Sequence, residues 1–190
     1  MMNTAAYSHI EFMNPKLEMK YLSLEKSRNR LLDELEGLDD ELLNLPPAAG
    51  KWSINQIIYH LIEVEKVTTG YVNNKLQKQE NLGASSFSNS FKSMLLKLAL
   101  RSGRKYKAPA VVANVPETGM LHKLRQQWDD TRFKLEDVLN EITPQHMDKC
   151  LFKHPFVGPL SINQTLAFLQ DHFEHHERQI QQLKRSLVRS

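Results

Sequence analysis

The sequence DHFEHHERQI runs from Asp171 to Ile180. It contains three of the eight histidines of the chain, and His172 and His176 are four residues apart. Its flanks have the apolar spacing of a long helix, on which residues four apart lie one above the other on the same face. Two imidazoles can therefore converge on one point, which makes half of a metal site. A third ligand has to come from another part of the chain.

The length favours one domain, and the lack of a membrane span or a signal peptide predicts a cytoplasmic protein. A chain of 190 residues can bury a core without disulfides, and we expect a flexible segment over residues 1–13 and a single domain over residues 14–190. The only cysteine, Cys150, excludes an intramolecular disulfide and a cysteine-based zinc site. No apolar run approaches the roughly 20 residues of a membrane span, and the N-terminus lacks the features of a signal peptide.

The net charge of +3 is small but unevenly distributed. No acidic residue occurs between Asn81 and Pro116, whereas the segment from Lys92 to Lys107 contains six cations. This basic segment lacks the interleaved aromatic residues of a single-strand platform and any motif that reads duplex DNA. A solvated connection is therefore favoured over a surface for nucleic acid, a membrane or an anionic substrate, and we predict no nucleic-acid partner.

Four segments have the apolar spacing of long amphipathic helices, at about residues 14–37, 53–76, 117–141 and from 161 onward. The first begins at Asn14-Pro15, a capping residue followed by the proline that suits the first turn. The second and fourth begin with the same capping-box sequence, Ser-Ile-Asn-Gln, at Ser53 and Ser161. The predicted buried face of the second helix consists of Ile57, Leu61, Val64, Val67 and Tyr71.

The remaining segments connect these helices. Residues 39–45 are expected to add a short helical turn, and Phe91–Arg101 a short amphipathic helix within the long connection between the second and third helices. His154 to Leu160 is predicted to form a rigid turn, since it is rich in proline and glycine. No segment predicts a strand. The expected fold is an all-α four-helix bundle with one long crossover that contains a short extra helix.

His60 is the candidate for the third ligand, because it lies at the edge of the apolar face of the second helix. A single inward histidine is most often a hydrogen-bonded core residue, but His60, His172 and His176 together favour a metal site, since imidazole is the commonest protein ligand. If the second and last helices run parallel, these residues stand at different levels along them, about 10 Å and about 20 Å from the helix starts.

The other polar residues near these positions have weaker patterns. His175 points about 100° away from His176 on a helix, so we predict that it lies at the rim of a pocket or on the surface. A carboxylate often orients a metal-bound imidazole through its second nitrogen, and the candidates are Glu63, Asp171 and Glu174. The remaining histidines carry no spacing signal: His9, His122, His146 and His154.

Three motifs together resemble the DinB superfamily, in particular its YfiT-like branch. They are Trp52–Gln56 followed by His60–Glu63, the turn from His154 to Leu160, and the pattern His-x-x-His-His-x-x-Gln-Ile that begins at His172. The resemblance extends from about Leu17 to Leu183 and implies a four-helix bundle that binds a divalent metal through three histidines. It assigns the ligands to His60, His172 and His176.

The function stays open among several classes. The resemblance implies a metal-dependent hydrolase, a transferase that uses a low-molecular-weight thiol such as mycothiol or bacillithiol, or a non-enzymatic metal-binding stress-response protein. Three protein ligands leave an open coordination position, which hydrolysis and thiol transfer would both use. Histidine sites accept zinc and nickel alike, so either ion is expected. The expected partner is a small-molecule substrate, and a homodimer through an exposed helix face remains an alternative.

Overall fold

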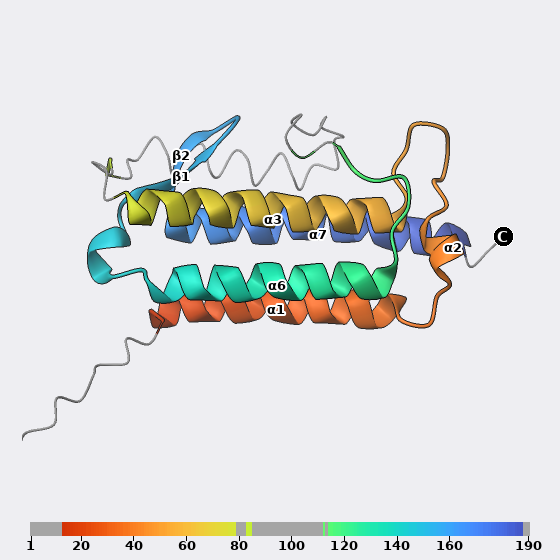
Figure 1. The fold of residues 1–190 in the computed structure, drawn as a ribbon, viewed down its shortest axis with the longest axis horizontal. Coiled ribbons are helices and arrows are strands. Elements are labelled where there is room, and N and C mark those ends of the chain that lie inside the picture. The colour runs from red at the N-terminus through yellow and green to blue at the C-terminus, as the bar shows by residue number, and fades with distance from the viewer. Residues whose placement is uncertain (1–12, 79–82, 85–111, 113, 188–190) are drawn as a thin grey trace, which may run out of the picture.

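Four long helices lie side by side along the molecule (Figure 1). They are α1 (Pro15–Leu35), α3 (Ile54–Gln77), α6 (Leu121–Asn140) and α7 (Ile162–Leu187), and the short helix α2 (Asp40–Leu43) follows α1 as predicted. The structure, a computed structural model, describes residues 13–78, 83–84, 112 and 114–187. Its fold is mostly helical, as the sequence predicted. The predicted helix at 91–101 and the basic segment from Lys92 to Lys107 lie outside the described residues.

The helix starts that the sequence predicted from local capping residues are confirmed. The Asn14 side chain accepts a hydrogen bond from the Lys16 amide at 3.0 Å, at the start of α1. Ser53 and Gln56 exchange the two hydrogen bonds of a capping box at the start of α3. Ser161 and Gln164 make the same pair of bonds at the start of α7 (2.9 and 3.4 Å). Each cap depends on residues at most three apart, which is why the sequence alone could locate it.

The predicted start of the third helix at Glu117 is wrong, since α6 begins at Leu121. The residues before it are held in place by distant side chains. Asn44 and Asn55 each donate to the Gly119 carbonyl oxygen at 2.8 Å. The Asp40 carboxylate accepts from the Leu121 amide at 2.8 Å and so caps α6 from α2. Because this cap is 81 residues away in sequence, no local pattern could indicate it.

The prediction that the chain contains no strand is also wrong. β1 (Cys150–His154) pairs with β2 (Gly158–Ser161) in an antiparallel hairpin, where the sequence predicted only a rigid turn. The pairing is irregular between Cys150 and Phe152, and the adjacent residues Leu151 and Phe152 are both buried. A bulge of this kind breaks the apolar–polar alternation by which a strand is recognised in a sequence.

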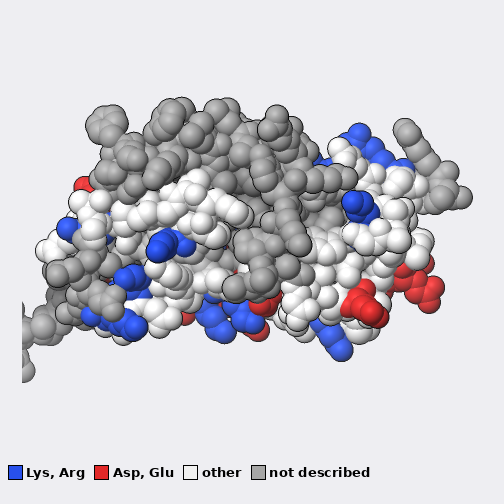
Figure 2. Space-filling model, turned by 90° about the horizontal axis from the view of Figure 1, so that it is seen from above, with Lys and Arg blue, Asp and Glu red and all other residues white. Residues whose placement is uncertain are grey.

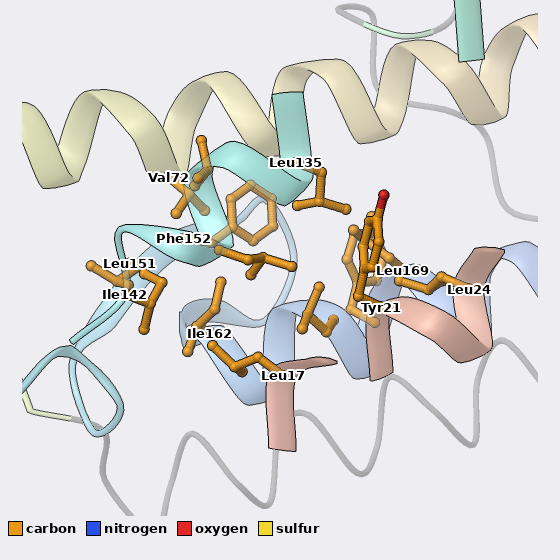
Figure 3. Close-up of a cluster of buried hydrophobic side chains, with 14 of the residues drawn as sticks. Leu17, Tyr21, Leu24, Val72, Leu135, Ile142, Leu151, Phe152, Ile162 and Leu169 are labelled. Atoms are coloured by element: carbon orange, nitrogen blue, oxygen red, sulfur yellow. The ribbon is translucent and has the colours of Figure 1, made fainter. Parts of the chain in front are cut away.

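The hairpin supplies part of the core at one end of the helices. Figure 3 shows Phe152 of β1 in a cluster with side chains of all four long helices, among them Leu17 of α1, Val72 of α3, Leu135 of α6 and Ile162 of α7. A second buried cluster lies around Trp128 of α6 and Phe173 of α7. Burying such faces is the main favourable contribution to folding, so the helices and the hairpin form one packed unit.

Helices α3 and α7 run in opposite directions (Figure 1). At 1.5 Å per residue, His60 lies about 25 Å from the C-terminal end of α3, and His172 and His176 lie about 15–21 Å from the start of α7. Because these two helix ends are neighbours in an antiparallel pair, the three histidines stand at similar levels. The difference in level that parallel helices would impose therefore does not arise.

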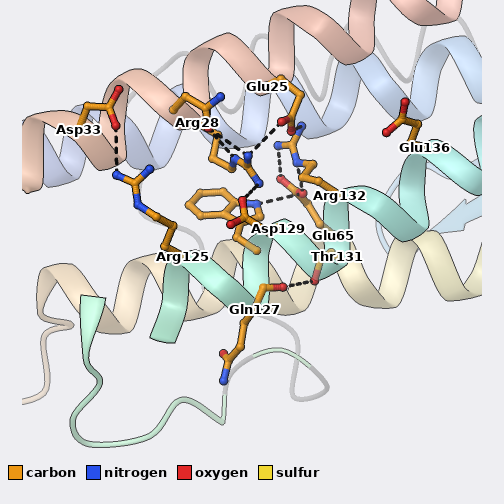
Figure 4. Close-up of polar contacts among 12 residues, drawn as sticks. Glu25, Arg28, Asp33, Glu65, Arg125, Gln127, Asp129, Thr131, Arg132 and Glu136 are labelled. Carbon is orange, nitrogen blue, oxygen red and sulfur yellow. Dashed lines mark hydrogen bonds and ion pairs between the residues drawn. The ribbon is translucent and has the colours of Figure 1, made fainter. Parts of the chain in front are cut away.

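A buried ionic network joins α1, α3 and α6 (Figure 4). Arg132 contacts both carboxylate oxygens of Glu65 at 2.8 Å, and the Trp128 indole N–H donates to the same carboxylate at 3.1 Å. Arg132 also lies 3.5 Å from Glu25, which pairs with Arg28 at 2.9 Å. Glu65, with an exposed fraction of 2%, thus occupies the protein interior.

This network explains a wrong prediction about the buried face of α3. The apolar spacing placed Val67 in the core, yet Val67 is 40% exposed. Glu65 and Thr68 are buried in its place. Val67 and Glu65 are two residues apart, and such residues do not share a helix face. The partners of Glu65 come from α6 and so were invisible in the sequence of α3.

The face of the molecule seen from above in Figure 2 carries charges of both signs on its described part. Lysine and arginine side chains stand at separate places there, and acidic side chains are most evident toward the end where α2 lies. Among the described helices, none is both long and apolar enough to cross a bilayer.

Candidate metal centre

The three histidines predicted as metal ligands lie together between α3 and α7. One ring nitrogen of His60, one of His172 and one of His176 all lie within 4.8 Å of one another. The ring centroids are 5.2 Å apart for His60 and His172, 4.9 Å for His60 and His176, and 4.6 Å for His172 and His176. Three nitrogens at this spacing could hold one metal ion.

The protonation of His60 is determined by its neighbour. Its Nδ1 lies 2.9 Å from the carbonyl oxygen of Val112. A carbonyl oxygen can only accept a hydrogen bond, so Nδ1 must carry the proton and the lone pair must be on Nε2. A metal-binding histidine typically has this arrangement, with one nitrogen oriented by a partner and the other free to coordinate.

His176 is oriented in a similar way by a neighbour on its own helix. Its Nδ1 lies 2.9 Å from the side-chain oxygen of Gln179, which leaves Nε2 available. The prediction that a carboxylate orients His60 is wrong for Glu63, whose carboxylate pairs with Lys66 at 3.1 Å. The partners of these two ligands are a main-chain carbonyl and an amide. Gln179, three residues beyond His176, could have been identified from the sequence by its spacing, whereas Val112 could not.

Burial keeps the three imidazoles neutral. Desolvation, with smaller effects from His60 and His175, lowers the pKa of His176 to about 3. Desolvation is also the main reason that the pKa of His172 is well below its ordinary value and that the pKa of His60 is lowered. A histidine must be unprotonated to bind a metal, so this environment suits the donor set.

Aromatic side chains flank the histidines on both helices. The Trp52 ring, just before α3, is centred 5.0 Å from that of His60. On α7, Phe168 is 5.6 Å from His172 and 4.6 Å from His154 of the hairpin. These rings place apolar surface beside the histidines, and electrostatic interactions are stronger where apolar surface replaces water.

His175 does not lie at a rim or on the surface, as the sequence predicted, but is buried. Its ring centroid is 5.0 Å from that of His176, and its Nε2 lies 3.0 Å from the amide nitrogen of Gln179. It is not one of the three convergent residues. The helical angle therefore correctly kept His175 away from the ligand position but did not predict its burial by neighbouring elements.

His154, which carried no signal in the sequence, has a structural role in the hairpin. Its Nδ1 accepts hydrogen bonds from the amides of Phe156 and Val157 at 3.2 and 3.4 Å, so its neutral form has the proton on Nε2. Burial lowers its pKa from 6.5 to about 4. His154 thus stabilises the hairpin turn through its hydrogen bonds, and its ring packs against Phe168, which lies beside His172.

We expect His154 to make the metal-free protein sensitive to acid. As the pH falls from 6.5 toward about 4, the unfolded chain binds a proton at this residue before the folded chain does, so the protein loses stability. His154→Asn keeps an acceptor for the turn but does not titrate. Urea unfolding at pH 7 and pH 5 should show a loss that is about 2 kcal/mol smaller in this variant.

The exposed His122 of α6 provides the matched control for this measurement. His122→Asn should show the same loss of stability between pH 7 and pH 5 as the parent protein. If the loss is equal in the parent and in His154→Asn, then His154 is protonated in the folded protein at the same pH as in the unfolded chain.

Comparison with known proteins agrees with these features. The model of the DinB superfamily matches residues 23–180, which is most of the chain. The chain belongs to the DinB superfamily. This DinB-superfamily protein is also similar to the uncharacterized protein YuaE of Bacillus subtilis (strain 168), with 24% identity over 165 residues. The match covers 87% of this chain and 97% of YuaE. The resemblance to the DinB superfamily inferred from the sequence motifs is thus confirmed.

Proposed function

We propose that this DinB-superfamily protein binds a divalent metal ion through His60, His172 and His176 in a four-helix bundle. The observation that supports this best is the convergence of three neutral imidazoles within 4.8 Å. The Val112 carbonyl fixes the proton of His60 on Nδ1, the nitrogen turned away from the metal position. Zinc and nickel are the ions proposed, since three nitrogen ligands and no cysteine suit both.

We further propose that the centre serves a metal-dependent enzyme with a small-molecule substrate. Three protein ligands leave an open coordination position, whereas a purely structural zinc site is normally closed by a fourth protein ligand. A divalent ion here would supply Lewis acidity to a group bound in the open position. The residues around it contribute binding and orientation, and Trp52 and Phe168 place apolar surface beside the ligands.

Two reactions fit this arrangement, hydrolysis and transfer to a low-molecular-weight thiol. A panel of small electrophiles, incubated with and without thiols and followed by mass spectrometry, separates them. Thiol-dependent products support a transferase, and thiol-independent addition of water supports a hydrolase. The alternative is a non-enzymatic metal-binding stress-response protein. This alternative is favoured if the metal-bound protein converts none of the electrophiles.

The test of metal binding is the metal content of protein purified without a histidine tag, compared with that of His172→Ala. We expect about one equivalent of metal in the parent protein and little in the variant. The variant should remain as helical as the parent by circular dichroism, because its core of apolar faces and buried ion pairs does not depend on this residue. Loss of helical signal at 25 °C in His172→Ala would instead make the site structural.

A further inference from the structure

The side chain of Gln179 lies between two buried histidines with different roles. Its oxygen is 2.9 Å from Nδ1 of His176, a proposed metal ligand. Its nitrogen is 3.0 Å from Nε2 of His175, which is not a ligand. Gln179 is therefore the direct polar link between the metal centre and a histidine outside it.

An amide group donates hydrogen bonds from one end and accepts them at the other. The two ring nitrogens that touch Gln179 must therefore be in opposite states, one protonated and one bare. When the metal occupies Nε2 of His176, the proton of this ring is on Nδ1 and donates to the oxygen of Gln179. The amide nitrogen then donates to a bare Nε2 of His175, which leaves the proton of His175 on Nδ1.

A second arrangement has the same heavy-atom positions. If the amide is turned over, its nitrogen donates to a bare Nδ1 of His176, and its oxygen accepts from Nε2–H of His175. In this arrangement Nε2 of His176 carries a proton and cannot bind a metal. Both arrangements are neutral, so the choice between them is one of tautomer and not of charge. Metal binding removes the second.

We infer that Gln179 is a positioning residue that accepts the Nδ1 proton of metal-bound His176 and transmits the metal-bound state of that ligand to His175. The inference rests on the proposed function, because it requires metal at His176. It adds that a histidine outside the coordination sphere changes its tautomer population when the metal binds. His175 would thereby adjust its own hydrogen bonds to the state of the metal centre.

Two substitutions at position 179 separate this role from simple packing. Gln179→Glu has the same size but offers only acceptors, so it still orients His176 and cannot donate to His175. Zinc affinity should be equal to that of the parent or higher, while His175 should reverse its tautomer and donate from Nε2. Gln179→Met removes both hydrogen bonds, and zinc affinity should fall by about 10–100-fold, as is usual when a ligand loses its orienting partner.

Zinc affinity is measured by competition with a chromophoric chelator, and the tautomers by two-bond ¹H–¹⁵N NMR of the zinc-bound proteins at pH 8. Gln182→Met is the matched control, because Gln182 lies on the same helix and is exposed. It should leave both the affinity and the tautomer of His175 unchanged. Circular dichroism checks that each variant is folded.

The inference is overturned if His175 keeps the proton on Nδ1 in zinc-bound Gln179→Glu, or if Gln179→Met binds zinc as tightly as the parent. If Gln179→Met does not fold, the tautomer of His175 in Gln179→Glu still decides the matter. Failure of the parent protein to bind zinc or nickel is a different result, because it removes the proposed function and this inference with it.

Discussion

Replacing His60 with alanine is expected to weaken zinc binding by about three orders of magnitude, or about 4 kcal/mol. Zinc sites as a whole supply roughly 10–16 kcal/mol, and His60 is one of the three proposed ligands. It is also the only one of the three that comes from α3. Without it, His172 and His176 would be left as a two-nitrogen chelate on one helix.

The same substitution should abolish the stabilisation of the fold by metal. A ligand that binds only the folded state, present at 100 times its dissociation constant, contributes about 2.7 kcal/mol. A metal ion held by the three histidines would tie α3 to α7 in the parent protein. Thermal unfolding with and without zinc measures this difference. His122→Ala, which replaces an exposed histidine of α6, is the control and should behave as the parent does. Equal affinity and equal stabilisation in His60→Ala and the parent would remove His60 from the site.

Glu65→Gln is expected to lower the free energy of unfolding by about 3–5 kcal/mol. The substitution keeps the size of the side chain but removes the negative charge closest to Arg132. Because Arg132 is only 1% exposed, water cannot replace that charge. It also weakens the acceptor of the Trp128 indole. Urea unfolding of the metal-free protein gives the value directly, since this network includes none of the three histidines.

Glu63→Gln is the matched control for this experiment. Glu63 is on the same helix and pairs with Lys66, but the Lys66 side chain is 63% exposed. Exposed ion pairs contribute about 0–1 kcal/mol, so the control should lose no more than that. A loss below about 1 kcal/mol in Glu65→Gln would contradict this prediction. It would mean that water or a neighbouring group replaces the lost carboxylate as the partner of Arg132.

The sequence predicted the parts of the fold that depend on residues near one another. The starts of α3 and α7 follow from capping boxes, which are local and specific. The start of α6 was misplaced because its cap, Asp40, is far away in sequence. The burial of Glu65 was not predicted because apolar spacing identifies only apolar residues as buried. A buried charge depends on partners from other helices, which the spacing does not show.

The same division applies to the candidate site. His172 and His176 could be paired from their spacing alone. His60 could be chosen as the third candidate because it lies at the edge of the apolar face of another helix. Their convergence needed the directions of α3 and α7, which the sequence left open. The burial of His175 depends on the elements packed around α7 and so had no sequence signal, whereas its distance from the ligand position followed from the helical angle.

One orienting contact of the site comes from the main chain, at Val112, 52 residues beyond His60. Every residue has a carbonyl group, so the side chain at this position can change without removing the acceptor. A comparison of side chains across relatives would therefore assign no importance to it. What the contact does require is that the main chain at position 112 lies within 2.9 Å of the His60 ring. The site thus depends at this position on where the main chain runs, although the Val112 side chain is itself buried.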